Sequence, residues 1–216
     1  MYPINNIEGI EKQEAQFENK HVVILLFVKP SDIGADEYIN KINYLHYRSK
    51  EYCSIYLVGY SQCFNSDEYK DVQKVRGVDN EEWEYSDKCF SEVCYKLKER
   101  LKHWNYSGEP EMIILQNNTS VKRGSSLDFS NYNYIDVNYG IRKQYIDSFS
   151  RFMENLIDAC QKEVTSYKAI HLANRRKMKP RNVIEFALEE CPKLPIPIKK
   201  VLKDSLFYKS CRDKAA

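Results

Sequence analysis

The feature that most constrains the fold is a run of seven apolar residues at positions 22–28, Val-Val-Ile-Leu-Leu-Phe-Val. No polar residue interrupts the run, so a strand built from it has no face to turn toward water. Such a strand is covered on both sides, which is typical of a central strand in a sheet flanked by helices. Two shorter runs, residues 55–58 and 112–115, predict buried strands beside it.

Helical patterns separate these strands. Residues 35–47 place apolar side chains at helical spacing between the first two strands, which predicts a right-handed crossover joining parallel strands. Residues 87–104 predict a second amphipathic helix with Ser86 as its N-cap. The half-alternating segment 128–138 predicts a fourth strand, which a polar link joins to the third as an antiparallel pair. A long helix is expected from Gly140 onward.

The segment 61–82 fits this order least well. It is polar and mildly acidic, and a structureless loop of this length is uncommon inside a compact domain. Either it contains a short helix at residues 67–74 or it is a flap near a site, and we favour the short helix.

Charge divides the chain into two parts. Residues 161–216 hold 14 Lys and Arg against 6 Asp and Glu, a net charge of +8, whereas the rest of the chain has a net charge of −6. We therefore expect an α/β domain over residues 1–173 and a basic helical extension over residues 174–216.

Several absences indicate a soluble, cytoplasmic protein. The seven cysteines are scattered and form no C-x-x-C pair, which favours reduced thiols inside the cell. Residues 1–20 are polar and lack the apolar core of a secretory signal. No apolar run approaches the ~20 residues that span a bilayer, so no membrane partner is expected.

The order of elements over residues 20–160, β-α-β-α-β-β-α, resembles that of thioredoxin-like proteins. Pro110 precedes the third strand, where that family has a cis-proline; a trans proline beginning a strand is the equal alternative. The family's redox cysteines would follow the first strand, but residues 29–34, Lys-Pro-Ser-Asp-Ile-Gly, contain none, so thiol–disulfide chemistry is excluded. Residues 27–30, 45–49 and 104–109 also resemble segments of uncharacterised bacterial proteins, which implies no activity.

The competing architecture is a Rossmann-like sheet with an antiparallel edge strand. The chain has neither G-x-G-x-x-G nor a P-loop, so a standard nucleotide enzyme is not expected. The predicted fold class is α/β: a central mixed sheet of about four strands flanked by helices, thioredoxin-like or Rossmann-like, with a C-terminal helical extension.

Candidate binding residues follow the strand ends, because ligands of such sheets bind outside the carboxyl ends of parallel strands. Lys29, Ser31 and Asp32 follow the first strand, and Tyr60 and Gln62 follow the second. Asn117 joins them only if the third strand is parallel as well. Ser31 and Asp32 would also begin a helix, where backbone N–H groups attract an anion, or either could simply cap that helix.

Three further residues complete a candidate catalytic set. His46 and Arg48 can act as proton donor and anion clamp, or simply complement the dipole at a helix end. Glu109 can be a general base if it is buried near the strand ends, or part of a helix stop. With Ser31 and Asp32 they form the set. No Cys/His cluster has metal-ligand spacing and no G-x-S-x-G motif occurs, so no metal and no cofactor are expected.

Two functions remain open. The first is a cytoplasmic, non-redox binding or regulatory protein that acts through a protein partner or a small ligand. The alternative is a small enzyme for an anionic or nucleotide-like substrate at the carboxyl ends of the parallel strands. A concave pocket that gathers two or more of the catalytic candidates with shifted pKa values would favour the enzyme.

The basic extension suggests a partner of its own. Arg175, Arg176 and Lys177 begin its charged run, and its last predicted helix has an apolar side. We expect this extension to pack on protein, either its own chain or a second copy in a homodimer formed through the C-terminal helix. Nucleic-acid binding is expected to be weak and non-specific at most.

Overall fold

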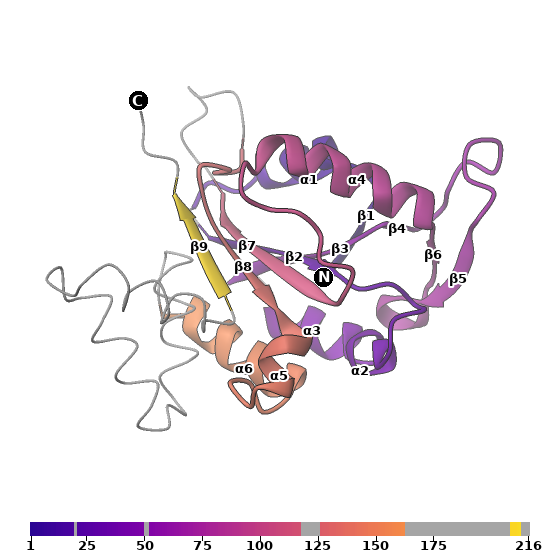
Figure 1. Cartoon of the computed structure of the whole chain (residues 1–216). Coiled ribbons are helices and arrows are strands. Elements are labelled where there is room, and N and C mark those ends of the chain that lie inside the picture. The colour runs from indigo at the N-terminus through magenta and orange to yellow at the C-terminus, as the bar shows by residue number, and fades with distance from the viewer. Residues whose placement is uncertain (20, 50–51, 118–125, 163–207, 213–216) are drawn as a thin grey trace, which may run out of the picture.

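A mixed sheet forms the centre of the molecule (Figure 1). The computed structural model describes residues 1–19, 21–49, 52–117, 126–162 and 208–212. The strands of the sheet are β1 (Tyr2–Ile4), β2 (Val22–Phe27), β3 (Cys53–Val58), β7 (Glu111–Gln116), β8 (Asn131–Asp136) and β9 (Tyr208–Arg212). Their order is β1-β3-β2-β7-β8-β9. β1 and β2 pair with β3 in parallel, whereas β7, β8 and β9 are joined by antiparallel pairs.

The predicted central strand lies inside this sheet. All six residues of β2 are buried, and Ile24 is paired with Ile55 on one side and with Ile114 on the other. The α/β fold class is thus confirmed, although the sheet has six strands in place of about four. The additional strands, β1 and β9, lie at the two edges of the sheet. β9 falls within residues 174–216, where a helical extension was expected, so that expectation is wrong for residues 208–212.

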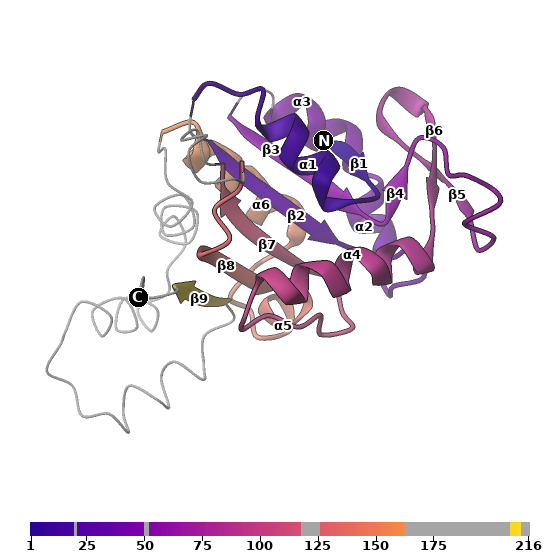
Figure 2. The ribbon, with the colours of Figure 1, turned by 90° about the horizontal axis from the view of Figure 1, so that it is seen from above.

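Helices cover both faces of the sheet (Figure 2). α1 (Ile7–Glu14) and α4 (Asp87–Arg100) lie on one face, and α3 (Ile42–Ser49) and α6 (Phe149–Cys160) lie on the other, next to α2 (Ala35–Ile39) and α5 (Val137–Arg142). Phe27 of β2 meets Phe90 of α4 with ring centroids 6.1 Å apart, and Tyr38 of α2 meets Phe149 of α6 at 4.3 Å. The apolar core therefore has two layers, one on each side of the sheet.

Two of the helices expected from the sequence are interrupted. The pattern over residues 35–47 forms α2 and α3, with a break at Asn40 and Lys41. The long helix from Gly140 is replaced by α5 and α6, because Ser148 begins a new helix by accepting a hydrogen bond from the Arg151 N–H at 3.3 Å.

The prediction of a short helix at residues 67–74 is wrong. This part of the chain leads into a hairpin in a second, three-stranded sheet. Its strands are β4 (Tyr60–Ser61), β5 (Gln73–Arg76) and β6 (Glu82–Tyr85), in the order β4-β6-β5. Asp79 and Asn80 in the short 3₁₀ segment η1 (Val78–Asn80) have φ of 53° and 63°, and this left-handed backbone reverses the chain. Val75 then pairs with Trp83 across the hairpin, a contact that helical spacing cannot reveal.

The N-terminus of α4 is capped as predicted. The Ser86 hydroxyl accepts a hydrogen bond from the Cys89 N–H at 3.1 Å and donates one to Asp71 Oδ1 at 2.7 Å. Asp71 Oδ2 accepts from the Lys88 N–H at 2.9 Å, and this backbone bond is the main reason why the pKa of Asp71 is lowered. The loop before β5 is thereby tied to the start of α4.

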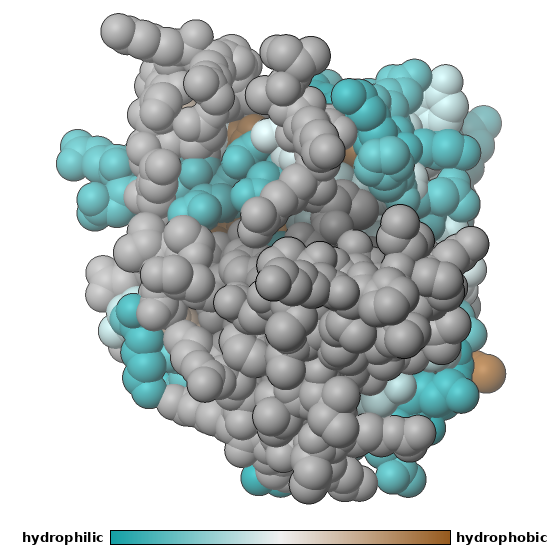
Figure 3. All heavy atoms as spheres, turned by 60° about the vertical axis from the view of Figure 1, so that its left-hand side comes forward, coloured by the Kyte–Doolittle hydropathy of each residue, from teal (hydrophilic) through white to brown (hydrophobic). Residues whose placement is uncertain are grey.

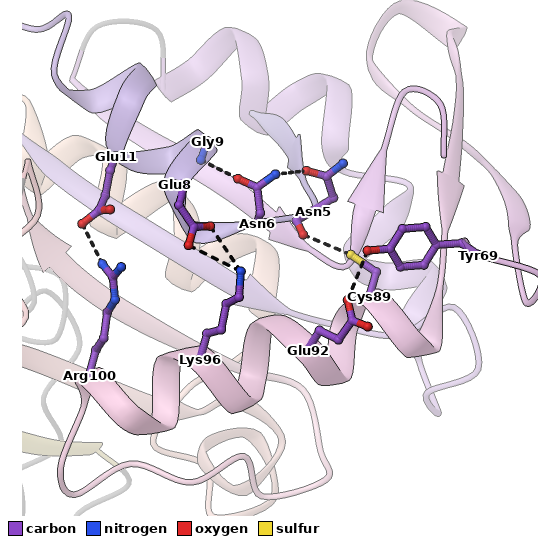
Figure 4. A network of polar contacts seen from close by, with 10 residues as sticks. All are labelled: Asn5, Asn6, Glu8, Gly9, Glu11, Tyr69, Cys89, Glu92, Lys96 and Arg100. Atoms are coloured by element: carbon purple, nitrogen blue, oxygen red, sulfur yellow. Dashed lines mark hydrogen bonds and ion pairs between the residues drawn. The ribbon is translucent and has the colours of Figure 1, made fainter. Parts of the chain in front are cut away.

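Polar contacts join α1 to α4 along their outer sides (Figure 4). Arg100 Nη1 lies 2.7 Å from Glu11 Oε1, and Lys96 Nζ lies 3.4 Å from Glu8 Oε1. All four side chains are partly exposed, so each pair contributes at most about 1 kcal/mol. The packing of α1 therefore depends mainly on its buried residues Ile7 and Ile10.

Three further observations bear on the predictions. No peptide bond in the described parts of the chain is cis, so Pro110 takes the trans alternative. No helix that the structure describes is long and apolar enough to span a membrane. On the face drawn in Figure 3 the described side chains are mainly hydrophilic.

Candidate functional site

The parallel strands β2 and β3 end on one side of the sheet, which we call the carboxyl edge. Because β7 is antiparallel to β2, its first residue, Glu111, lies opposite Phe27 at this edge. The last residue of β8, Asp136, lies opposite Glu111. The carboxyl edge therefore combines the ends of β2, β3 and β8 with the start of β7.

The loop after β2 brings three predicted residues to this edge. Asp32 Oδ2 accepts a hydrogen bond from the Lys29 N–H at 2.7 Å and so closes the turn after β2. The expectation that Ser31 or Asp32 caps the next helix is wrong, because Gly34 is the N-cap of α2 and no side chain caps it. Lys29 Nζ lies 3.2 Å from Asp87 Oδ1 and 5.0 Å from the centre of the Phe90 ring. Ser31 is exposed. The lysine charge is thus already balanced within the protein.

The carboxylates of the edge act on one another. The pKa of Asp32 is raised, first by burial and then by the charges of Asp87 and Glu109, although the Lys29 N–H and ammonium oppose the shift. Glu109 Oε2 in turn accepts a hydrogen bond from Arg142 Nη1 at 2.7 Å, in a half-exposed ion pair. Glu109 therefore lies at the carboxyl edge but is not buried, so the condition under which it could be a general base is not met.

Glu111 is the functional candidate that sequence reasoning missed. Its side chain is 1% exposed, and Oε1 accepts a hydrogen bond from Trp104 Nε1 at 2.9 Å. Burial raises the pKa of Glu111 to about 7, and hydrogen bonds from Ser107 and Trp104 only partly oppose the shift. The sequence signal that could have indicated Glu111 is its position directly before the apolar run at residues 112–115, where a carboxylate is drawn into the buried strand.

Aromatic rings form the floor beneath these charges. Phe27 contacts Trp104 at 5.1 Å between ring centroids, and Phe90 contacts Tyr106 at 5.0 Å. The Tyr106 hydroxyl is buried without a hydrogen-bond partner among the described residues, and burial raises its pKa. The Tyr60 hydroxyl donates to the Val28 carbonyl at 2.9 Å, so this predicted binding residue has a structural contact.

His46 and Arg48 do not join this site. α3 runs back against the direction of the parallel strands, so its C-terminal residues lie at the opposite, amino edge of the sheet. His46 Nδ1 is 2.6 Å from the Met1 nitrogen, and Arg48 Nη2 is 2.8 Å from Asp158 Oδ1. The five catalytic candidates are therefore divided between two ends of the molecule.

Asn117 also lies at the amino edge. It was expected at the carboxyl edge only if the third predicted strand, β7, were parallel to β2, and β7 is antiparallel. Its Oδ1 accepts a hydrogen bond from the His21 N–H at 2.8 Å, and its Nδ2 donates to the Asn19 carbonyl at 3.0 Å. The same Nδ2 faces His21 Nδ1 at 2.9 Å. Asn117 thus ties the end of β7 to the chain that enters β2.

A buried polar network surrounds His21 at this amino edge. His21 Nε2 lies 2.8 Å from Glu14 Oε2 and 3.0 Å from Ser54 Oγ, while the Tyr56 hydroxyl donates to Glu14 Oε1 at 2.6 Å. His21 Nδ1 lies 2.9 Å from Asn117 Nδ2 and 3.3 Å from the Asn19 carbonyl oxygen. In a serine–histidine–acid relay, serine and carboxylate contact opposite ring nitrogens. Here both contact Nε2, so the network joins α1, β2 and β3 without activating Ser54.

The remaining predicted residues add no chemistry to the edge. Gln62 Nε2 donates to Glu81 Oε2 at 3.4 Å on the surface. Arg175, Arg176 and Lys177 lie outside the described residues, as does the last predicted helix. Among the residues that the structure describes, no three His, Cys, Asp or Glu side chains are grouped to hold a metal ion.

The carboxyl edge is therefore an acidic surface over an aromatic floor. Its partly exposed carboxylates are Asp32, Asp87, Glu109 and Asp136, and Glu111 lies buried behind them. The cations that the structure describes there, Lys29 and Arg142, are each paired with a carboxylate. An arrangement of this charge attracts cations and repels anions. No protein-family model, no curated protein and no solved structure matches the chain.

Proposed function

We propose that the chain is a cytoplasmic, non-redox binding protein that engages a positively charged partner at the carboxyl edge. The partner is a basic protein segment or a small cationic ligand. The observation that carries the proposal is the excess of carboxylates at this edge, where both cations are already paired. Such a surface favours basic side chains through charge complementarity.

The alternative, an enzyme for an anionic or nucleotide-like substrate, has less support. An anion approaching the carboxyl edge would meet the carboxylates of Asp32 and Glu109. The negative charge of Glu109 already disfavours ionisation of Asp32, so a further negative charge is unfavourable there. His46 and Arg48, the residues that could donate a proton and clamp an anion, are engaged at the amino edge. The catalytic set is therefore not assembled around one reacting centre.

The thiols support the non-redox part of the proposal. Burial raises the pKa of Cys89 and that of Cys94 to about 12, so neither forms much thiolate near neutral pH. Within the described residues, Cys53, Cys63 and Cys160 are free as well. Reduced cysteines of this kind are typical of an intracellular protein.

The strand order supports a thioredoxin-like rather than a Rossmann-like relationship. The four inner strands run β3-β2-β7-β8, with a parallel first pair and antiparallel second and third pairs. A Rossmann-like sheet would continue in parallel through β7. We propose that the chain retains a thioredoxin-like arrangement whose redox loop is replaced by residues 29–34.

Thermal unfolding with charged probes tests the function. A ligand that binds only the folded protein raises its stability, and the gain grows with the logarithm of the ratio of ligand concentration to Kd. We expect spermidine and a short lysine-rich peptide to raise the melting temperature, and inorganic phosphate and AMP to leave it unchanged. The double variant Asp32→Asn/Glu109→Gln should lose most of the shift with both cations. Glu99→Gln, which removes an exposed carboxylate near the C-terminal end of α4, should keep it.

The same assay can contradict the proposal. Stabilisation by phosphate or AMP that depends on residues of the carboxyl edge would favour the enzyme. If the two cations still raise the melting temperature of the double variant, they bind elsewhere on the protein.

A further inference from the structure

The outer side of α3 exposes two neighbouring tyrosines. Tyr44 and Tyr47 are 41% and 53% exposed, and one helical turn separates them. Among the described residues only two other large hydrophobic side chains, Ile33 and Tyr95, are exposed, and they belong to a loop and to α4. Aromatic rings that are exposed side by side on one helix are typical of a protein interface, where aromatic residues are enriched relative to the rest of the surface.

Hydrogen bonds hold these side chains in place. The Tyr44 hydroxyl donates to Glu154 Oε1 of α6 at 2.9 Å, and the Tyr47 hydroxyl donates to Asp79 Oδ1 of η1 at 2.6 Å. The rings stay exposed while their hydroxyl groups are fixed. A partner that packs on them would therefore lose little side-chain entropy on binding.

Charges of both signs surround the tyrosines. Lys41, just before α3, is followed at intervals of three and four residues by Tyr44 and Arg48 of α3, and Arg151, Glu154 and Asp158 have the same spacing on α6. The two rows are joined by the Tyr44–Glu154 bond and by the 2.8 Å contact between Arg48 and Asp158. We call these six residues, with Tyr47 and Asp79, the tyrosine surface. It contains three cations and three carboxylates, so its charges are balanced.

We propose that the tyrosine surface is a homodimer interface, in which α3 and α6 of one chain pack on the same helices of a second copy. A two-fold interface brings a surface against itself, so a charged patch within it is complementary to itself only if it contains both signs of charge. The tyrosine surface meets this condition. The carboxyl edge does not, because two acidic edges would repel each other, and it stays free for the partner proposed above.

The tyrosine rings would supply the contact energy of this dimer. Tyrosine and arginine, together with tryptophan, are enriched among the residues that dominate binding energy at protein interfaces. Tyr44 and Tyr47 would pack near the two-fold axis, and Arg48 of each chain would approach the carboxylates of the other. The proposal therefore makes both tyrosine rings necessary for association.

Sedimentation velocity on the full-length chain tests the proposal. We expect the wild-type protein to sediment increasingly as a dimer between about 1 and 200 μM, as a modest interface would. The double variant Tyr44→Ala/Tyr47→Ala should weaken dimerisation by about tenfold or more, which corresponds to the loss of interface aromatic side chains. Tyr95→Ala is the matched control: it removes a tyrosine that is 65% exposed on α4, and should leave the dimer intact.

A second variant covers the case in which the double substitution impairs folding. Lys41→Glu changes one exposed residue of the tyrosine surface, reverses a charge there and should also weaken the dimer. A wild-type protein that stays monomeric over the whole concentration range would overturn the proposal and leave the tyrosine surface to a different protein. So would a dimer that keeps its affinity in Lys41→Glu, or one that Tyr95→Ala disrupts equally.

Discussion

Glu111 makes the stability of the protein depend on pH. Its pKa is about 7 in the folded protein and 4.5 in the reference state, so the folded state holds the proton more tightly. The stability from this proton is fully present below about pH 4.5 and is lost as pH rises toward 7, a difference of about 3 kcal/mol. Above that range the buried charge remains as a cost.

We therefore expect Glu111→Gln to flatten this part of the pH profile. The amide can still accept the hydrogen bond from Trp104, but it does not titrate. Urea unfolding between about pH 4.5 and 7.5 should show a smaller loss of stability in the variant than in the wild type. Trp104→Phe removes a hydrogen bond that favours the carboxylate, so it should move the titration to higher pH. Parallel profiles for wild type and Glu111→Gln would contradict this account.

Gly59 has two independent reasons to be glycine. Its φ is +85°, and a Cβ at this position would lie 2.7 Å from Phe90 Cβ and 3.0 Å from Phe90 Cα. We expect Gly59→Ala to cost the left-handed strain of about 1–2 kcal/mol and a further 1–3 kcal/mol for displacing α4. Gly108→Ala is the control, because Gly108 has φ of +90° with nothing within 4 Å of its Cβ position. Equal losses of unfolding free energy in the two variants would show that α4 can shift freely.

At the scale of elements, the start of α4 depends on the cap that Ser86 provides. The buried hydroxyl satisfies the Cys89 N–H and binds Asp71 of the preceding loop. We expect Ser86→Ala to lower the unfolding free energy by about 1–2 kcal/mol. Hydrogen exchange should also become faster at Lys88 and Cys89. Ser91→Ala is the matched control, since this exposed hydroxyl only donates to the Asp87 carbonyl of its own helix and its loss should be within about 0.5 kcal/mol.

At the scale of the whole molecule, the C-terminal part of the chain completes the central sheet. β9 pairs with β8 from Asn131 opposite Arg212 to Ile135 opposite Tyr208. Removing residues 208–216 would leave the backbone groups of β8 unpaired at a sheet edge, where they can recruit other chains. We expect this truncation to lower the melting temperature and to promote aggregation. A truncation of residues 213–216 alone, beyond the strand, should do neither. If both truncated proteins melt like the full chain, β9 contributes little to the sheet.

The carboxyl edge was predicted in part. Strand ends that follow continuous apolar runs are local features, so Lys29, Ser31 and Asp32 were placed correctly near the end of β2. Whether Asn117 joins them depends on the direction of β7, and an antiparallel β7 moves this residue to the other side of the sheet. The burial that raises the pKa of Glu111 depends on Trp104 and on the layer of α4, which no short stretch of sequence specifies.

The sequence by itself determined the inner strands β2, β3, β7 and β8, the α/β class and the cap of α4, because apolar runs, alternation and capping residues act over a few positions. Tertiary structure decided the rest. The hairpin of β5 and β6 forms because Val75 meets Trp83 across a left-handed turn, and β1 and β9 become strands because β3 and β8 offer free edges. In each case the stabilising partner is distant in sequence or lies across a turn, so local periodicity carries no information about it.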